Sequence, residues 1–269
     1  MEANGNVQQR DLAAMGFAVR RVPLDAPFEW LARGWRDVCA VPSVSLAYGA
    51  LFTFVAWFFV FGLGLIDATS AIPILASGFV LLGPLLTTGL YQTSRRLEEG
   101  EKITLRQVFD LDSAAYGRLA FFSVVLFFAF AFWILLAFLL LMLFLGGAAA
   151  PPPEELVHIL LFTNAGLGLL FSGTLTGAVL AAIVFSTSTV AVPLLLTKDI
   201  DAVSAIVTSV RAIKVNIGPM LLWAALIAGF MVQGIVTLFI GLIVAFPLLG
   251  HATWHAFRAL VDVDKALSR

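Results

Sequence analysis

The chain has 269 residues, of which 61% are hydrophobic and 12% are charged, and its mean hydropathy is +1.00. A soluble domain of this length carries about a quarter of its residues as charged side chains. The composition therefore excludes an ordinary soluble domain, and the long apolar stretches predict a protein that lies in a membrane. The net charge of −1 gives no indication of a nucleic-acid partner.

The first 43 residues lack the basic start, short apolar run and cleavage site of a signal peptide. We therefore expect the mature chain to begin at Met1, with residues 1–26 as a flexible cytoplasmic tail. The single cysteine, Cys39, has no partner for an internal disulfide and no neighbouring cysteine with which to bind a metal.

Six apolar runs predict an all-α polytopic membrane protein, because each is near the 20 or so residues that cross a hydrocarbon core of about 30 Å. They cover residues 46–66, 71–91, 119–145, 166–196, 218–233 and 235–254. Together they form one transmembrane domain over residues 27–262, followed by a cytoplasmic tail at 263–269. The stretch 156–196 is also long enough for two spans.

The basic residues decide the number of spans. All 16 lysines and arginines fall in residues 1–41, 95–118, 198–214 and 255–269. With six spans these four segments share one side of the membrane, which the positive-inside rule makes the cytoplasm. A seventh span within 156–196 would carry the last six basic residues across the membrane. We therefore predict six spans, cytoplasmic termini, a structureless outer connector at 146–153 and a short outer helix at 156–164.

Three cytoplasmic segments have an amphipathic pattern. The apolar face predicted for the first comprises Phe28, Leu31, Trp35 and Val38. The second begins with a capping box at Thr104 and Gln107, flanked by Ile103 and Val108 as a hydrophobic staple. The third follows Asp199 and Asp201, both read as helix N-caps, and its apolar face comprises Val203, Ile206, Val207, Val210 and Ile213. Such helices either lie flat on the membrane or pack on the protein's own cytoplasmic end, and both alternatives remain open.

The amphipathic segments reveal a repeat, because each precedes a pair of spans. The chain therefore reads as three helix hairpins, each preceded by a cytoplasmic amphipathic helix. The second span of each pair contains Pro-Leu-Leu near its cytoplasmic end, beginning at Pro84, Pro193 and Pro247. A proline inside a helix removes one backbone hydrogen bond and bends the helix. We expect these kinks to lie at one membrane depth and to splay three helix ends around a common centre.

Four motifs carry a resemblance to a known family. They are residues 216–225 (NIGPMLLWAA), 247–256 (PLLGHATWHA), 30–37 (WLARGWRD) and 83–86 (GPLL). In these motifs, and from about Val22 to Leu260, the chain resembles a family of predicted bacterial integral membrane proteins known as domain of unknown function 2189. The resemblance implies a bacterial inner-membrane location, and it implies no substrate, cofactor or catalytic residue.

The most suggestive side chains are His251 and His255, which share a helical face at i, i+4 spacing. This spacing suits two ligands of a metal or haem, and the pair is therefore a candidate cofactor site. The local sequence supplies no further ligands, so we favour an interfacial belt formed with Trp254 at the inner edge of the membrane. We accordingly expect no metal and no cofactor.

The predicted spans contain no Asp, Glu, Lys or Arg, which counts against an ion-coupled pump. In the fourth span Gly173 and Gly177 form a GxxxG among several serines and threonines. This pattern predicts close helix packing, with a polar-lined path as the sharper alternative.

No arrangement of nucleophile, base and orienting group rises above chance, so we expect that the chain is not an enzyme. Two functions remain open. The first is a non-enzymatic accessory or scaffold subunit that lies in the lipid bilayer and binds other inner-membrane proteins, such as a respiratory complex. The alternative is a transporter or channel for a small uncharged or amphiphilic molecule.

The predicted topology is testable with reporter fusions. Fusions at Ala3, Gly100, Asp201 and Leu267 should report the cytoplasm, and fusions at Ala68 and Ala149 should report the outside, because all the basic segments share one side. An external signal at Leu267 alone would mean that the number of crossings is odd.

Overall fold

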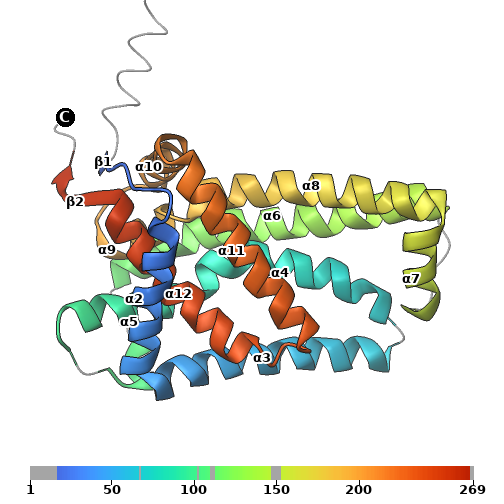
Figure 1. The fold of residues 1–269 in the computed structure, drawn as a ribbon, viewed down its shortest axis with the longest axis horizontal. Coiled ribbons are helices and arrows are strands. Elements are labelled where there is room, and N and C mark those ends of the chain that lie inside the picture. The colour runs from blue at the N-terminus through green and yellow to red at the C-terminus, as the bar shows by residue number, and fades with distance from the viewer. Residues whose placement is uncertain (1–16, 67, 102, 110–112, 147–152, 267–269) are drawn as a thin grey trace, which may run out of the picture. The chain divides into compact units, whose positions relative to one another are not determined.

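The computed structural model describes residues 17–66, 68–101, 103–109, 113–146 and 153–266, and the expectations for residues 1–16, 147–152 and 267–269 lie outside these ranges. The described chain is almost entirely helical, which confirms the all-α prediction (Figure 1). Its elements are β1 (Phe17–Val19), α2 (Ala26–Ala40), α3 (Pro42–Leu65), the 3-10 helix η1 (Thr69–Ala71), α4 (Ile72–Leu86), α5 (Thr88–Glu98), the 3-10 helix η2 (Leu105–Phe109), α6 (Ser113–Leu145), α7 (Pro153–Phe162), α8 (Asn164–Ser188), α9 (Ala191–Thr197), α10 (Ala202–Val215), α11 (Ile217–Val236), α12 (Leu242–Leu260) and β2 (Val261–Ala266).

The contacts divide the chain into two compact units, where the sequence predicted one domain. Unit 1 consists of the described parts of Met1–Thr53, Pro84–Phe122 and Ser186–Arg269. Unit 2 consists of the described parts of Phe54–Gly83 and Ser123–Phe185. Each unit is described by itself.

Among the described residues, five helical stretches are long and apolar enough to cross a membrane. They are Pro42–Leu65, Ile72–Glu98, Ala115–Leu145, Asn164–Thr197 and Ile217–Val236. These stretches coincide with the first five predicted spans, so the chain is a polytopic helical membrane protein. The sixth prediction, residues 235–254, does not correspond to one helix, because α11 continues to Val236 and α12 begins only at Leu242. The second half of α12 also carries two histidines and an arginine, which lower its apolar character.

The sequence predicts tails at residues 1–26 and 263–269, whereas the structure has short strands at Phe17–Val19 and Val261–Ala266. Strands β1 and β2 pair antiparallel, with Val19 opposite Val261. The amide of Arg20 donates to the Leu260 carbonyl at 2.8 Å, and its guanidinium lies 3.0 Å from Asp262. The two ends of the described chain are therefore joined in unit 1.

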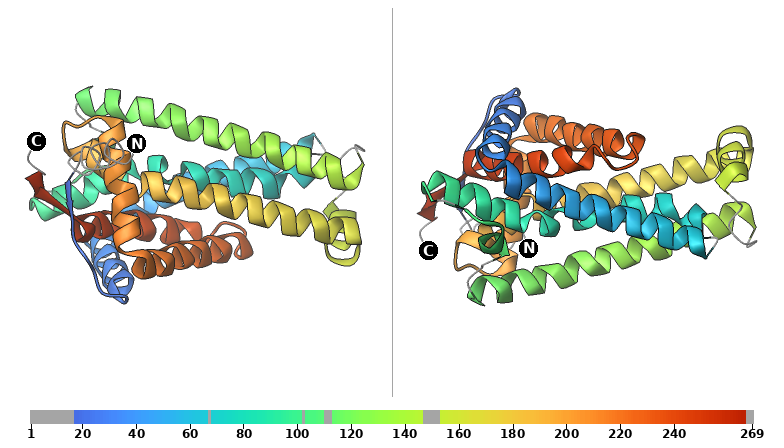
Figure 2. Two further views of the ribbon diagram at one scale, coloured as in Figure 1. Left: turned by 90° about the horizontal axis from the view of Figure 1, so that it is seen from above. Right: turned by 90° about the horizontal axis from the view of Figure 1, so that it is seen from below.

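In unit 2, Trp133 of α6 joins α4 and α8, and Figure 2 shows α6 and α8 as long helices with α7 at one end of α8. The Trp133 indole donates to the Ile74 carbonyl at 3.0 Å, and its ring lies against Gly78 and Gly177. Gly177 therefore serves close packing, although against an aromatic ring. Gly173 has no neighbour within 4 Å of its Cβ position, so the predicted GxxxG packing does not extend to it.

The amphipathic helices α2 and α10 pack on the rest of unit 1, α10 through small side chains and α2 around Trp30 and Gly34. The buried face of α2 comprises Ala26, Pro27, Trp30, Gly34 and Val38, and that of α10 comprises Ala205, Thr208, Ser209 and Ala212. Of the predicted apolar faces only Val38 is buried, while Phe28, Trp35 and Val203 are exposed. The packing on the rest of unit 1 therefore uses other positions than the predicted apolar faces, and the contact of those faces with the membrane surface stays a prediction.

The caps of the second and third segments follow the prediction in part. The amide of Thr104 donates to the Gln107 side chain at 2.9 Å, but only the 3-10 helix η2 follows it. Asp201 caps α10 by accepting from the Ser204 amide at 2.9 Å, and the Ser204 hydroxyl and amide together hold the pKa of Asp201 below its usual range. Asp199 is not a cap, since it pairs with Arg118 at 3.0 Å.

The three proline sites lead into helices that meet in unit 1. Pro84 lies near the end of α4, Pro193 in the first turn of α9 and Pro247 inside α12. The helices α5, α9 and α12 each contact the other two. The helix ends at these prolines therefore pack together, whereas the sequence predicted that they would diverge. The superposition of three hairpins at one membrane depth stays a prediction.

A close approach of α3 and α12 supports the core of unit 1. Here Tyr48, Leu90, Leu242 and Phe246 are buried in one cluster, and Tyr48 donates to the Leu86 carbonyl at 2.6 Å. A Cβ added at Gly49 would collide with the backbone of Ile243. Glycine is therefore required at this crossing for steric reasons.

We expect Gly49→Ala to lower the free energy of unfolding by about 1–3 kcal/mol, because backbone atoms cannot yield to the added methyl group. Gly62→Ala is the matched control, since it lies on the same helix with no neighbour within 4 Å. It should be neutral or stabilising by up to about 1 kcal/mol. Thermal unfolding in detergent measures both, and equal effects would contradict the close crossing.

Candidate functional site

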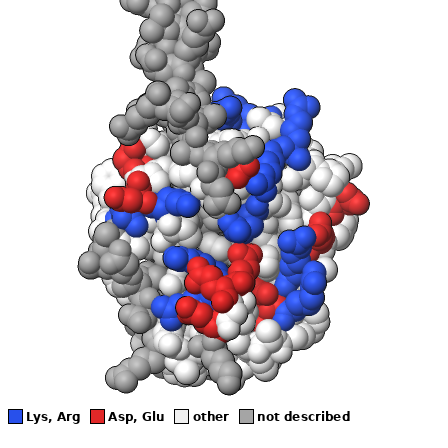
Figure 3. Space-filling view, turned by 90° about the vertical axis from the view of Figure 1, so that its left-hand side faces the viewer, with Lys and Arg blue, Asp and Glu red and all other residues white. Residues whose placement is uncertain are grey.

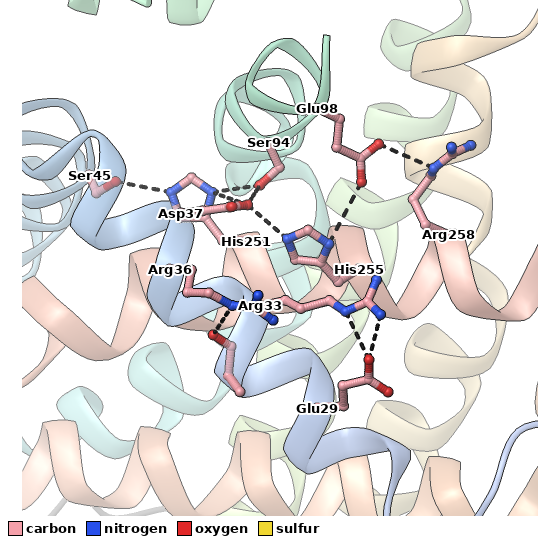
Figure 4. Close-up of polar contacts among 11 residues, drawn as sticks. Glu29, Arg33, Arg36, Asp37, Ser45, Ser94, Glu98, His251, His255 and Arg258 are labelled. Atoms are coloured by element: carbon pink, nitrogen blue, oxygen red, sulfur yellow. Dashed lines mark hydrogen bonds and ion pairs between the residues drawn. The ribbon is translucent and has the colours of Figure 1, made fainter. Parts of the chain in front are cut away.

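A buried polar cluster lies where α12 packs against α2, α5 and the start of α3, all within unit 1 (Figure 4). Close packing positions it, because a Cβ at Gly34 of α2 would lie 2.7 Å from the Ala252 backbone. The His251 side chain is 0% exposed, and Trp254 and His255 are also buried. The interfacial-belt interpretation is therefore wrong, since protein covers these rings on every side.

Hydrogen bonds define how His251 is protonated. Its Nδ1 lies 2.7 Å from Ser94 Oγ, and the Ser94 hydroxyl donates to Asp37 Oδ2 at 2.6 Å. A serine hydroxyl has a single proton, so Ser94 must accept a hydrogen bond from His251 Nδ1–H. The ring is fully buried, and its Nδ1 lies 3.8 Å from Asp37 Oδ2, beyond hydrogen-bond distance, so burial favours its uncharged form. His251 Nε2 then accepts from the Ser45 hydroxyl at 3.0 Å.

His255 extends the same chain toward the surface. Its Nε2 donates to Asp37 Oδ2 at 2.8 Å, and its Nδ1 lies 3.7 Å from Glu98 Oε1. Glu98 Oε2 in turn lies 3.3 Å from Nε of Arg258, a half-exposed side chain. Figure 4 shows this continuous path from a buried serine to a surface arginine, with the Asp37 carboxylate at its centre.

Helical spacing explains why these side chains meet. His251, His255 and Arg258 follow i, i+4, i+7 spacing and share one face of α12. On the neighbouring helix α5, Ser94 and Glu98 repeat the four-residue spacing. The sequence reasoning missed Asp37, Ser45, Ser94 and Glu98. One sequence signal could have found Ser94 and Glu98, because they are four residues apart, as His251 and His255 are.

The cluster is suited to hydrogen bonding more than to metal binding. A metal ligand needs a ring nitrogen with a free lone pair, yet both nitrogens of His251 face serine hydroxyls and His255 Nε2 faces Asp37. Within the part of the chain that the structure describes, no group of three or more His, Cys, Asp or Glu is arranged to hold a metal ion. The histidines thus join four elements by polar contacts.

Charged side chains of both signs lie close together on the face that Figure 3 shows. Arg33 pairs with Glu29, and Arg95 lies 3.1 Å from Glu99. Exposed pairs of this kind contribute at most about 1 kcal/mol each. On the face that Figure 3 shows, the described Lys and Arg side chains lie among Asp and Glu side chains.

Residues 71–197 match the sequence model of a family described as "Predicted integral membrane protein (DUF2189)". The match confirms the resemblance over these residues, from α4 to α9, and supports the assignment of the chain as an integral membrane protein. The matched segment includes Ser94 and Glu98 of the polar cluster. Asp37, His251 and His255 lie outside the matched segment. No curated protein and no solved structure matches the chain.

We expect the double change His251→Gln and His255→Gln to lower the free energy of unfolding by about 2–5 kcal/mol, because Ser45, Ser94 and Asp37 lose well-placed partners inside the protein. A pair of rings at the membrane surface would tolerate the same change. Thermal unfolding in detergent is the measurement, with His158→Gln on the exposed side of α7 as the control. An unchanged midpoint in the double variant would contradict the buried cluster.

Proposed function

We propose that this chain is a non-enzymatic accessory or scaffold protein of the bacterial inner membrane, which binds another membrane protein through the outward face of α2. In this proposal six membrane-inserted helices form three hairpins, each preceded by a cytoplasmic segment, and both termini are cytoplasmic. The observation that carries the proposal is the exposure of Phe28 (56%) and Trp35 (49%) on α2, a helix that is otherwise firmly held.

The inner side of α2 is held by three kinds of contact. Trp30 packs edge-to-face on Trp223, with ring centroids 5.8 Å apart. Gly34 lies against the backbone of Ala252, and Asp37 accepts hydrogen bonds from Ser94 and His255. A surface that is already rigid loses less conformational entropy when a partner binds it. The outward side chains of α2 are therefore well prepared for a protein contact.

The composition of the outward face favours a protein partner over lipid headgroups. Aromatic and arginine side chains are enriched at the centres of protein interfaces. Helices that lie on anionic lipid carry mainly basic residues on their polar side. On α2 the exposed Arg33 pairs with Glu29, so its polar side is of mixed charge.

The proposal gives the polar cluster a structural role, since the His251 side chain is 0% exposed. A shallow open depression beside α10 is lined by Arg118, Phe121, Ile200, Asp201, Ala202 and Val203. Its charged side chains serve the fold, because Arg118 binds Asp199 and Asp201 caps α10. The depression offers no specific support for a transporter.

Cross-linking in native membranes tests the proposal. A photo-reactive amino acid at Phe28 should form one adduct of defined protein mass, and Trp35→Asp should abolish it by placing a charge in the interface. A probe at Val203 of α10 is the matched control, because its exposure is similar (58%). Adducts with lipid alone at Phe28, or the same adduct from Val203, would contradict binding through α2.

A further inference from the structure

We infer that α11 and α12 form a re-entrant hairpin, which enters the bilayer, turns among the lipid acyl chains and returns to the side from which it came. Four helical stretches then cross the membrane, and the third hairpin does not. The inference rests on the proposed function only for the statement that the hairpin enters the bilayer from the cytoplasmic side.

The first argument is the place where the hairpin turn meets α3. The Thr53 hydroxyl donates to the carbonyl of Phe239, in the turn, at 3.2 Å. With a rise of 1.5 Å per residue, Thr53 lies about 16 Å from the start of α3 and about 18 Å from its end. A hydrocarbon core is about 30 Å thick. The turn therefore lies beside the middle of a helix that is long enough to cross (Figure 1).

Helix α12 provides a second, independent measure of depth. From Leu242 at its start to His251 in the polar cluster is nine residues, or about 14 Å. The remainder of α12 is buried against α2 and α5 and carries His255 and Arg258. Only the first half of α12 is thus available to lie in the membrane, and this is about half of the required thickness.

Helix α11 has the length to cross, but its first two turns lie beside α2. Asn216, its N-cap residue, donates to the Arg20 carbonyl at 3.0 Å, and Trp223 packs on Trp30. The part of α11 beyond Trp223 has 13 residues, or about 20 Å if it runs straight. An inclined helix of this length reaches the turn at mid-membrane without passing through.

The chemistry of the turn fits hydrocarbon surroundings. Every backbone amide of residues 237–245 has a hydrogen-bond acceptor within the hairpin, including the Gly241 amide, which donates to Thr237 Oγ1 at 2.9 Å. Backbone groups inside a bilayer must be satisfied in this way, because no water replaces a missing partner. Water-exposed turns do not have this requirement.

The side chains of the turn agree with its backbone. Leu238 and Phe239 have φ angles of 52° and 67°, a conformation that glycine or asparagine adopts more easily. The chain instead places large apolar residues there. Leu238 is 71% exposed and the adjoining Val236 is 76% exposed, so the tip presents an apolar surface that suits acyl chains.

Cysteine accessibility tests the inference, and the exposed native Cys39 is first changed to serine. Leu238→Cys should resist a membrane-impermeant maleimide from both sides in spheroplasts and in inverted vesicles, because the tip lies among acyl chains. In the same background Ala68→Cys and Gly100→Cys should react from opposite sides, as the markers of the two surfaces. Ile240→Cys is a second tip variant in case Leu238→Cys fails to accumulate.

A depth measurement completes the test. A bimane fluorophore on the tip cysteine should be quenched most strongly by lipids that carry a nitroxide near the end of the acyl chain. Reaction of the tip on the side that labels Ala68 would show a crossing hairpin and overturn the inference. Reaction on the side that labels Gly100 would place the hairpin outside the membrane and overturn it as well. If Ala68 reacts from the cytoplasmic side and Gly100 from the outer side, the proposed topology is wrong but the re-entrant hairpin is not affected. Failure of the cross-linking at α2 would likewise leave the accessibility of the tip unchanged.

Discussion

The Asp37 carboxylate is the constraint on which the rest of unit 1 depends. One of its oxygens accepts hydrogen bonds from both Ser94 and His255, so it joins α2, α5 and α12 at a single point. Through Ser94 and His251 the same contacts reach Ser45 at the start of α3. The donors around it are buried, and removing a buried acceptor leaves each of them without compensation. Any other arrangement of these four helices that separates Asp37 from its donors is therefore less stable.

Two further features follow from this constraint. Helix α2 lies with Gly34 against α12, which turns Phe28 and Trp35 outward. The second half of α12 is retained by the polar cluster, so the α11–α12 hairpin reaches only as far as the first half of α12 permits. A similar logic operates at the break between α8 and α9, where the Val190 amide donates to Ser209 of α10. There a side chain of a neighbouring helix satisfies a backbone amide at the helix break.

The sequence was a reliable guide to the membrane helices and a poor one to their contacts. The five helical stretches that are long and apolar enough to cross follow from apolar length alone, because the thickness of the hydrocarbon core sets that length. The run at 235–254 misled because the two positions of the turn with positive φ are Leu238 and Phe239, large apolar residues that continue the apolar pattern. The faces of α2 and α10 were predicted from the bulky residues of an amphipathic pattern, whereas α2 packs through Trp30 and Gly34 and α10 through alanine, serine and threonine. The histidine pair was found by its spacing, but its partner Asp37 lies 218 residues from His255. No local pattern contains a contact of that range.

The protonation of the His251 ring tests the central role of Asp37 most directly. Nitrogen-15 NMR of histidine-labelled protein in lipid bilayers, with His158→Gln and His255→Gln used for assignment, distinguishes the two ring nitrogens. If the Ser94 proton is directed to Asp37, His251 must carry its own proton on Nδ1, and Nε2 must be unprotonated. A ring protonated on Nε2 with bare Nδ1 would require Ser94 to donate to the histidine instead. That result would break the chain of hydrogen bonds at Asp37 and contradict the account.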